Sequence, residues 1–155
     1  MNKFFLTISI LVLSACNTSD YVWFAGGLEE AKAKAEDKLI LLDFYTDSWG
    51  GCIRLDAETF SDPFVQSFSK QNFISVKYNA NDEEGHTYYE QFNCEAVPSL
   101  IYVDSDGNEV DRIIGFLPPA EYLQRIQDIR SNRYTLSDYL NRYQSGEVNA
   151  DIVAG

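Results

Sequence analysis

One run of apolar residues, Leu39–Tyr45, constrains the fold of this chain more than any other feature. Its sequence, LILLDFY, is nearly continuous in apolar side chains, which is typical of a strand buried on both faces. Strands of this kind occur in sheets that helices cover on both sides, so helices are expected on either side of this run in the sequence. A single charged residue, Asp43, lies inside it.

The remaining sequence predicts an alternation of helices and strands. Helix formers, capping residues and prolines at the first turn predict helices over 28–37, 52–58, 81–92, 118–130 and 135–143, and a further helix that begins at Ser61-Asp62-Pro63. Apolar and β-branched runs predict further strands at 73–78, 99–103 and 109–114. The last two strands are joined by the turn sequence DSDG. We therefore predict an α/β fold with helices on both faces of a mixed central sheet, in which parallel crossovers are combined with one terminal antiparallel hairpin.

Composition excludes several classes of function. A length of 155 residues predicts one domain, and 45% hydrophobic residues are enough for one core. Twelve Lys and Arg against 24 Asp and Glu give a net charge of −12, which argues against nucleic-acid partners. With one His and three scattered Cys, no metal site is expected, and no motif indicates a cofactor.

The first residues are typical of an export signal. A short positive start is followed by an apolar run over 4–13, which is too short to span a bilayer. The sequence Leu13-Ser14-Ala15-Cys16 resembles the lipobox of bacterial lipoproteins, in which the signal is removed and the cysteine is lipidated. We expect a signal peptide at 1–15 and a lipidated Cys16 opening a tether at 16–27; an ordinary signal peptide that happens to contain a Cys is the alternative. The expected location is the bacterial cell envelope, with the domain anchored to the membrane in the periplasm or at the cell surface.

The stretch from Lys38 to Arg130 resembles the thioredoxin family, near its thiol:disulfide interchange branch, and we expect a thioredoxin-like domain over 28–131. The order of elements matches, and four local motifs carry the likeness: Leu42-Asp43-Phe44-Tyr45, the segment 56–63 (DAETFSDP), Val97-Pro98-Ser99-Leu100 and Gly115-Phe116-Leu117-Pro118. They resemble, in turn, the strand before the active site, the segment after it, the cis-proline loop and the glycine before the last helix. The resemblance implies a thioredoxin-like fold. The residues that follow, 132–155, are expected to form a C-terminal helical extension.

The active-site motif itself departs from the family. Counted from Asp43 without gaps, Ser48-Trp49-Gly50-Gly51-Cys52 falls on the family's Trp-Cys-Gly-Pro-Cys. Trp49 therefore replaces the first cysteine, which is the nucleophile of the family, and only the second remains as Cys52. Because disulfide exchange of this kind moves two electrons and needs both thiols, dithiol catalysis by this motif is not expected.

Two interpretations of Cys52 stay open. The resemblance matches Asp43 to the family's buried proton acceptor and Lys77 to the lysine that pairs with it, which would suit an activated thiol. Alternatively, Asp43 and Lys77 form an internal ion pair and Cys52 is a small core residue with a raised thiol pKa, which is the interpretation that we prefer. Cys94 is expected in the core. The alternative is a redox pair between Cys52 and Cys94, and we expect that this disulfide does not form.

Two hypotheses of function follow from these residues. The first is an anchored binding module without dithiol activity, in which Trp49, Val97 and Pro98 bind an extended peptide or envelope protein at the cis-proline face. For Trp49, packing back onto the domain is an equal alternative. The second hypothesis is an atypical thiol-disulfide oxidoreductase that uses Cys52 alone or with Cys94. Whether the chain is an enzyme stays open at this point.

Overall fold

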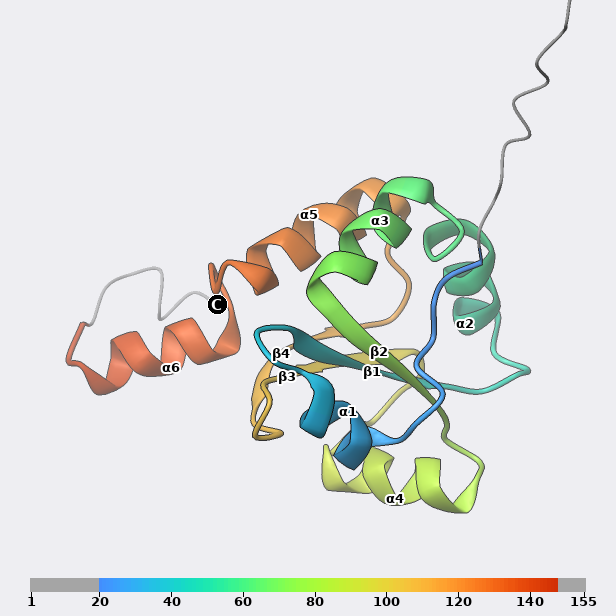
Figure 1. Ribbon diagram of the computed structural model, residues 1–155, viewed down its shortest axis with the longest axis horizontal. Coiled ribbons are helices and arrows are strands. Elements are labelled where there is room, and N and C mark those ends of the chain that lie inside the picture. The colour runs from blue at the N-terminus through green and yellow to red at the C-terminus, as the bar shows by residue number, and fades with distance from the viewer. Residues whose placement is uncertain (1–19, 148–155) are drawn as a thin grey trace, which may run out of the picture.

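A four-stranded mixed sheet forms the centre of the computed structural model, which describes residues 20–147 (Figure 1). The strand order is β2-β1-β3-β4. The strands are β1 (Leu39–Tyr45), β2 (Phe73–Asn79), β3 (Ser99–Val103) and β4 (Glu109–Ile114). The predicted α/β fold and mixed sheet are confirmed. The predicted signal peptide at 1–15, the predicted lipidation site at Cys16 and residues 148–155 lie outside the described residues.

The pairing of the strands differs from the prediction in one respect. Strand β2 runs parallel to β1, and β4 forms the expected antiparallel hairpin with β3. Strand β3, however, is antiparallel to β1, so the described sheet contains a single parallel pair. Apolar runs give the position of a buried strand but not its direction, because both orientations bury the same side chains.

Helices cover both faces of the sheet, as predicted (Figure 1). They are α1 (Leu28–Lys34), α2 (Gly50–Arg54), α3 (Pro63–Asn72), α4 (Glu83–Gln91), α5 (Pro119–Arg130) and α6 (Leu136–Gln144). A π-helical turn, η1 (Leu55–Thr59), directly continues α2. The capping predictions are confirmed, since Asp62 accepts hydrogen bonds from the first amides of α3 and Thr135 from the Asp138 amide. Among the described residues, no helix is long and apolar enough to cross a membrane.

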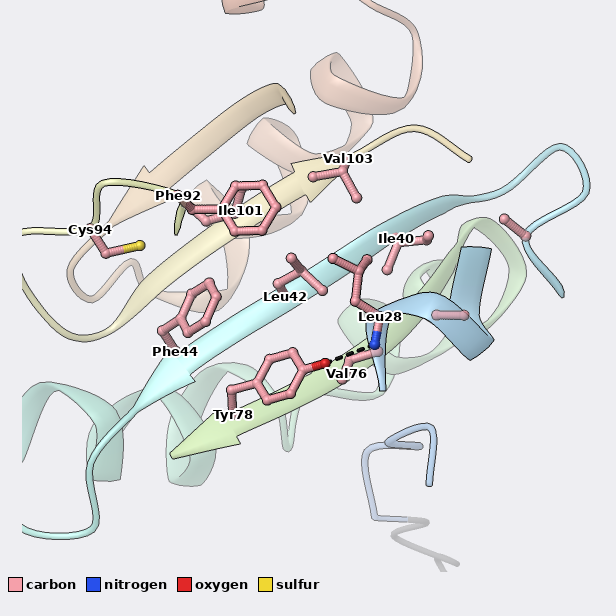
Figure 2. Packing of buried hydrophobic residues seen from close by; sticks show 12 residues of the cluster. Leu28, Ile40, Leu42, Phe44, Val76, Tyr78, Phe92, Cys94, Ile101 and Val103 are labelled. Carbon is pink, nitrogen blue, oxygen red and sulfur yellow. Dashed lines mark hydrogen bonds between the residues drawn. The ribbon is translucent and has the colours of Figure 1, made fainter. Parts of the chain in front are cut away.

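Strand β1 divides two hydrophobic cores. Ile40, Leu42 and Phe44 point into the core beneath α1 and α4, where the Leu28 amide donates to the Tyr78 hydroxyl at 2.7 Å (Figure 2). Leu41 points into the other core, against η1, α3 and α5. All four side chains are fully buried, so the prediction of a strand buried on both faces is confirmed. Asp43 lies on the same side as Leu41, because successive side chains of a strand alternate.

Candidate functional site

Trp49 occupies the exposed corner where β1 passes into α2. The turn after β1 ends at Trp49, which is the N-cap residue of α2 and carries a side chain that is 58% exposed. A Cβ placed on Gly51 would lie 3.2 Å from Pro98 Cδ and 3.2 Å from the Trp49 indole nitrogen. The indole and the proline ring therefore flank the same glycine. Trp49 is therefore more than half exposed, with one edge of its indole against Gly51.

Cys52 lies one turn further into the helix and has lost access to solvent. The residue is only 3% exposed, and its thiol is not part of a disulfide. Burial raises the pKa of the Cys52 thiol, and the carboxylates of Asp43 and Asp56 act in the same direction. Both effects keep the sulfur in its weakly nucleophilic thiol form.

Beneath Cys52, Asp43 and Lys77 face each other across the parallel pair of strands. They are direct partners in the β1–β2 register, and Lys77 Nζ lies 3.8 Å from Asp43 Oδ2. The second oxygen of Asp43 is buried and has no hydrogen-bond partner among the described residues. Desolvation raises the pKa of Asp43 to about 7, although the ammonium group of Lys77 opposes the rise. The carboxyl group is therefore poised to hold a proton near neutral pH.

The closer partner of Lys77 is Asp56, a residue that sequence reasoning did not assign to the site. Lys77 Nζ donates to the two Asp56 carboxylate oxygens at 2.6 and 2.7 Å, and lies 4.9 Å from the ring centroid of Trp23. Trp23, Asp56 and Lys77 line an open cavity of about 560 Å³. The expected ion pair with Asp43 is therefore long, because Asp56 draws the ammonium group towards solvent. The one signal in the sequence was the position of Asp56 at the start of the interchange-like segment 56–63.

The loop before β3 has the geometry expected from its sequence. The Val97–Pro98 peptide bond is cis, and the Gly115 amide donates to the Pro98 carbonyl at 2.8 Å. The backbone amide and carbonyl of Val97 have no hydrogen-bond partner among residues 20–147. Next to Gly115, Phe116 lies under the guanidinium group of Arg54, which is 3.9 Å from the ring centroid. The loop thus presents one free backbone donor and one free acceptor beside the Trp49 indole.

Cys94 is a core residue and is not paired with Cys52. Its side chain packs with Phe44, Phe92 and Ile101 beneath α4 (Figure 2). Both cysteines are free and buried, as expected, and burial raises the thiol pKa of Cys94 as well. In residues 20–147, no three side chains of His, Cys, Asp or Glu converge to hold a metal ion.

The site as a whole combines an intact cis-proline loop with an incomplete redox motif. Exchange with a substrate disulfide needs an exposed thiolate that attacks and a second thiol that resolves the mixed disulfide. The position of the attacking thiol is occupied by Trp49, and the remaining thiol of Cys52 is buried. The arrangement can contact a polypeptide through Trp49 and the Val97 backbone without supplying a dithiol.

Comparison with known proteins agrees with this geometry. A family model described as a thioredoxin-like domain matches residues 27–130. The thiol:disulfide interchange protein DsbD of Yersinia pestis is 33% identical over 104 residues, which are 65% of this chain but 18% of that protein. The chain thus spans about a fifth of the length of this relative.

Solved structures show the same likeness. A putative disulphide-isomerase from Bacteroides thetaiotaomicron has a TM-score of 0.62 at 27% identity, covering 70% of this chain and 91% of that one. The C-terminal domain of DsbD from Neisseria meningitidis, in its oxidised form, has a TM-score of 0.55 at 24% identity, covering 68% and 90%. Together with the sheet order, the cis-proline loop and the family match over 27–130, these findings show that the chain belongs to the thioredoxin-like family.

Proposed function

We propose that this chain is a thioredoxin-like binding module of the bacterial envelope, which holds an extended peptide or partner protein and performs no dithiol exchange. The proposal rests on one observation at the start of α2. An exposed Trp49 occupies the position of the family's nucleophile, and the remaining thiol, that of Cys52, is buried. The DsbD relatives, named as thiol:disulfide interchange proteins, support the assignment to the envelope.

The proposed mode of binding is the addition of an extended segment to the Val97 backbone. A segment lying along the cis-proline loop would accept a hydrogen bond from the Val97 amide and donate one to the Val97 carbonyl. The Trp49 indole, beside Gly51 and Pro98, would cover one of its side chains. Backbone bonds would supply affinity for many sequences, and the indole would favour segments with an apolar or aromatic residue.

A thiol-free unfolded polypeptide tests this mode of binding. The full chain is titrated with a reduced, carboxymethylated protein, and binding is followed by fluorescence anisotropy of the labelled probe. Trp49→Ala should weaken binding about 10-fold, the effect of losing one aromatic contact. Phe64→Ala, a matched control on α3 that is also exposed, should leave the affinity unchanged. Absence of binding, or equal binding by Trp49→Ala, would contradict the proposal.

Anchoring through Cys16 is part of the same proposal and has a separate test. Cells expressing the chain are grown with labelled palmitate, and the label should enter the wild type and be absent from Cys16→Ser. Two or more acyl chains would hold the module stably at the membrane, because each buried CH₂ contributes about 0.8 kcal/mol. A labelled Cys16→Ser variant would show that the anchor lies elsewhere.

The second candidate function is an atypical oxidoreductase that uses Cys52 alone or with Cys94. Asp43 favours it, because a carboxyl group with a pKa raised to about 7 could exchange a proton with the neighbouring thiol. Insulin reduction decides between the two functions. We expect no rate above that of the chemical reductant, whereas a rate that Cys52→Ser abolishes would establish the second function.

A further inference from the structure

Helix α6 turns its apolar side away from the domain. Leu136, Leu140 and Tyr143 are 44%, 49% and 64% exposed, and no residue of the helix is buried. The half-buried positions of the helix are Ser137, Asp138, Tyr139 and Arg142, so the charged pair and one aromatic side chain lie towards the domain. A surface helix normally does the opposite, burying its apolar stripe and exposing its charges. Within residues 20–147, therefore, nothing covers this stripe.

Polar contacts at the start of α6 fix this orientation. Thr135 is fully buried, and its hydroxyl accepts a hydrogen bond from the Asp138 amide at 3.0 Å. Arg125 of α5 donates to the Tyr134 carbonyl at 3.2 Å and also pairs with Asp111 of β4. Turning the helix over would break the bond between Arg125 and the Tyr134 carbonyl and would bring Thr135 out of its buried position. The stripe is thus held outward.

The stripe has the spacing of a coiled-coil seam and an uncharged border. Leu136, Leu140 and Tyr143 follow each other at intervals of four and three residues, which is the a/d spacing of a heptad. The residues that border the stripe are uncharged: Tyr139 on one side, and Gln144 and Ser137 on the other. The helix's charged pair, Asp138 and Arg142, lies on the other side, with 3.8 Å between Arg142 Nη1 and Asp138 Oδ2.

The charge of the chain is distributed unevenly around this helix. Residues 20–111 hold six Lys and Arg against 19 Asp and Glu, a net charge of −13. Residues 112–147 hold five Arg against four acids, a net charge of +1. Helix α6 projects beyond α5 at one end of the molecule (Figure 1). Two copies that meet through α6 would therefore avoid the like-charge repulsion that most other orientations carry.

We propose that this stripe is the contact surface of a homodimer, in which α6 packs antiparallel against α6 of a second copy. A two-fold axis beside Leu140 would bring the two Leu140 side chains together and place Leu136 against Tyr143 of the second copy. The uncharged border favours a second copy over a different helix, because heterotypic pairs are selected by charges beside the seam. A nine-residue helix buries far less than the roughly 800 Å² per partner of a standard interface. The dimer is therefore weak, with a dissociation constant of about 10–100 µM.

Analytical ultracentrifugation tests the dimer in the full chain carrying Cys16→Ser. We expect a reversible monomer–dimer equilibrium between low and high micromolar concentrations. Leu140→Glu should raise the dissociation constant at least 30-fold, roughly the effect of two like charges at the centre of the seam. Phe64→Glu, which changes an exposed side chain far along the chain on α3, should leave the equilibrium unchanged. A monomer at every concentration, or a dimer that Leu140→Glu does not weaken, would overturn the proposal.

Disulfide trapping tests the predicted symmetry. On the Cys16→Ser background, Leu140→Cys should form an oxidised dimer much faster than Phe64→Cys, since Cys52 and Cys94 are buried and do not compete. Equal rates for the two variants would contradict the axis beside Leu140. If removal of residues 148–155 converts a monomeric chain into dimers, that segment covers the stripe and the homodimer is not the native arrangement.

Discussion

The start of helix α2 and the sheet beneath it form two parts of one site, and they differ in how far they match a thiol-exchange centre. Beneath the helix, Asp43 and Lys77 remain paired across β1 and β2, and the Val97–Pro98 bond is cis. At the start of the helix, Trp49 is exposed where a nucleophile is required. The geometry of the cis-proline loop and of the Asp43–Lys77 pair therefore depends on strand and loop packing, whereas the redox step depends on one exposed side chain.

Restoring that side chain should give the largest effect. Trp49→Cys recreates a Cys-Gly-Gly-Cys motif whose first thiol lies at the exposed N-cap of α2, where unpaired amides favour the thiolate. We expect insulin reduction by dithiothreitol to accelerate at least about 100-fold over the wild type, because both thiols needed for exchange are then present.

The double variant Trp49→Cys/Cys52→Ser provides the control. It keeps the new exposed thiol but cannot resolve the mixed disulfide, so its rate should return to that of the wild type. If the wild type already reduces insulin as fast as Trp49→Cys does, the two parts of the site do not differ in how far they match a thiol-exchange centre.

The reactivity of Cys52 sharpens the same comparison. In a Cys94→Ser variant of the chain carrying Cys16→Ser, we expect iodoacetamide to react with Cys52 at least about 100-fold more slowly than with a free cysteine. The reason is burial, which both shields the sulfur and raises its pKa. The rate should keep rising beyond pH ~8.5, the ordinary thiol value. Full reactivity in urea is the control, and a plateau below that pH would indicate an activated thiol.

The sequence predicted the elements of this fold better than the contacts of the site. Leu39–Tyr45 is a strand as expected, because an apolar run of that length is stable only when covered on both sides. Two features depend on the third dimension: the antiparallel pairing of β3 with β1, which left no local pattern, and the contact of Asp56 with Lys77, for which the position of Asp56 in the segment 56–63 was the one signal. The π-helical turn that carries Asp56 replaces the single helix expected over 52–58, and aims that carboxylate at β2.

The same principle explains why α6 was predicted as a helix but not in its orientation. Its apolar spacing and Thr135 cap are local signals, and both are present in the structure. The side on which the apolar stripe lies depends on tertiary contacts such as the bond from Arg125 of α5 to the carbonyl of Tyr134, in the connection that precedes α6. Periodicity shows that a stripe exists, and tertiary contacts decide what it faces.

Asp43→Asn should change the free energy of unfolding by more than Asp56→Asn does. The folded pKa of Asp43 is raised to about 7 from 3.8, so the folded state binds more protons than the unfolded state between those values. Stability is therefore lost as the pH rises through this window. Asparagine carries no charge to bury, so the variant should exceed the wild type by about 1–3 kcal/mol near pH 8 and by little near pH 4. Urea unfolding at both pH values measures the difference; an equal effect at each would exclude ionisation of Asp43 as its cause.

The smallest effect on stability is expected from Asp56→Asn, although it addresses the pairing of Lys77 most directly. The Asp56 side chain is about half exposed, so the loss of its bond to Lys77 should cost less than about 1 kcal/mol. The Asp56 charge raises the pKa of Asp43, and its removal also frees Lys77 Nζ to approach Asp43 Oδ2 from its present 3.8 Å. Both changes favour the ionised form, so the pKa of Asp43 should fall below that of the wild type in a carboxyl ¹³C NMR titration.

Ser61→Ala, a neighbouring change that leaves the carboxylate in place, should not move the pKa of Asp43. An unchanged titration in Asp56→Asn would mean that Lys77 stays in the open cavity without the carboxylate, held there by the rings of Trp23 and Tyr45.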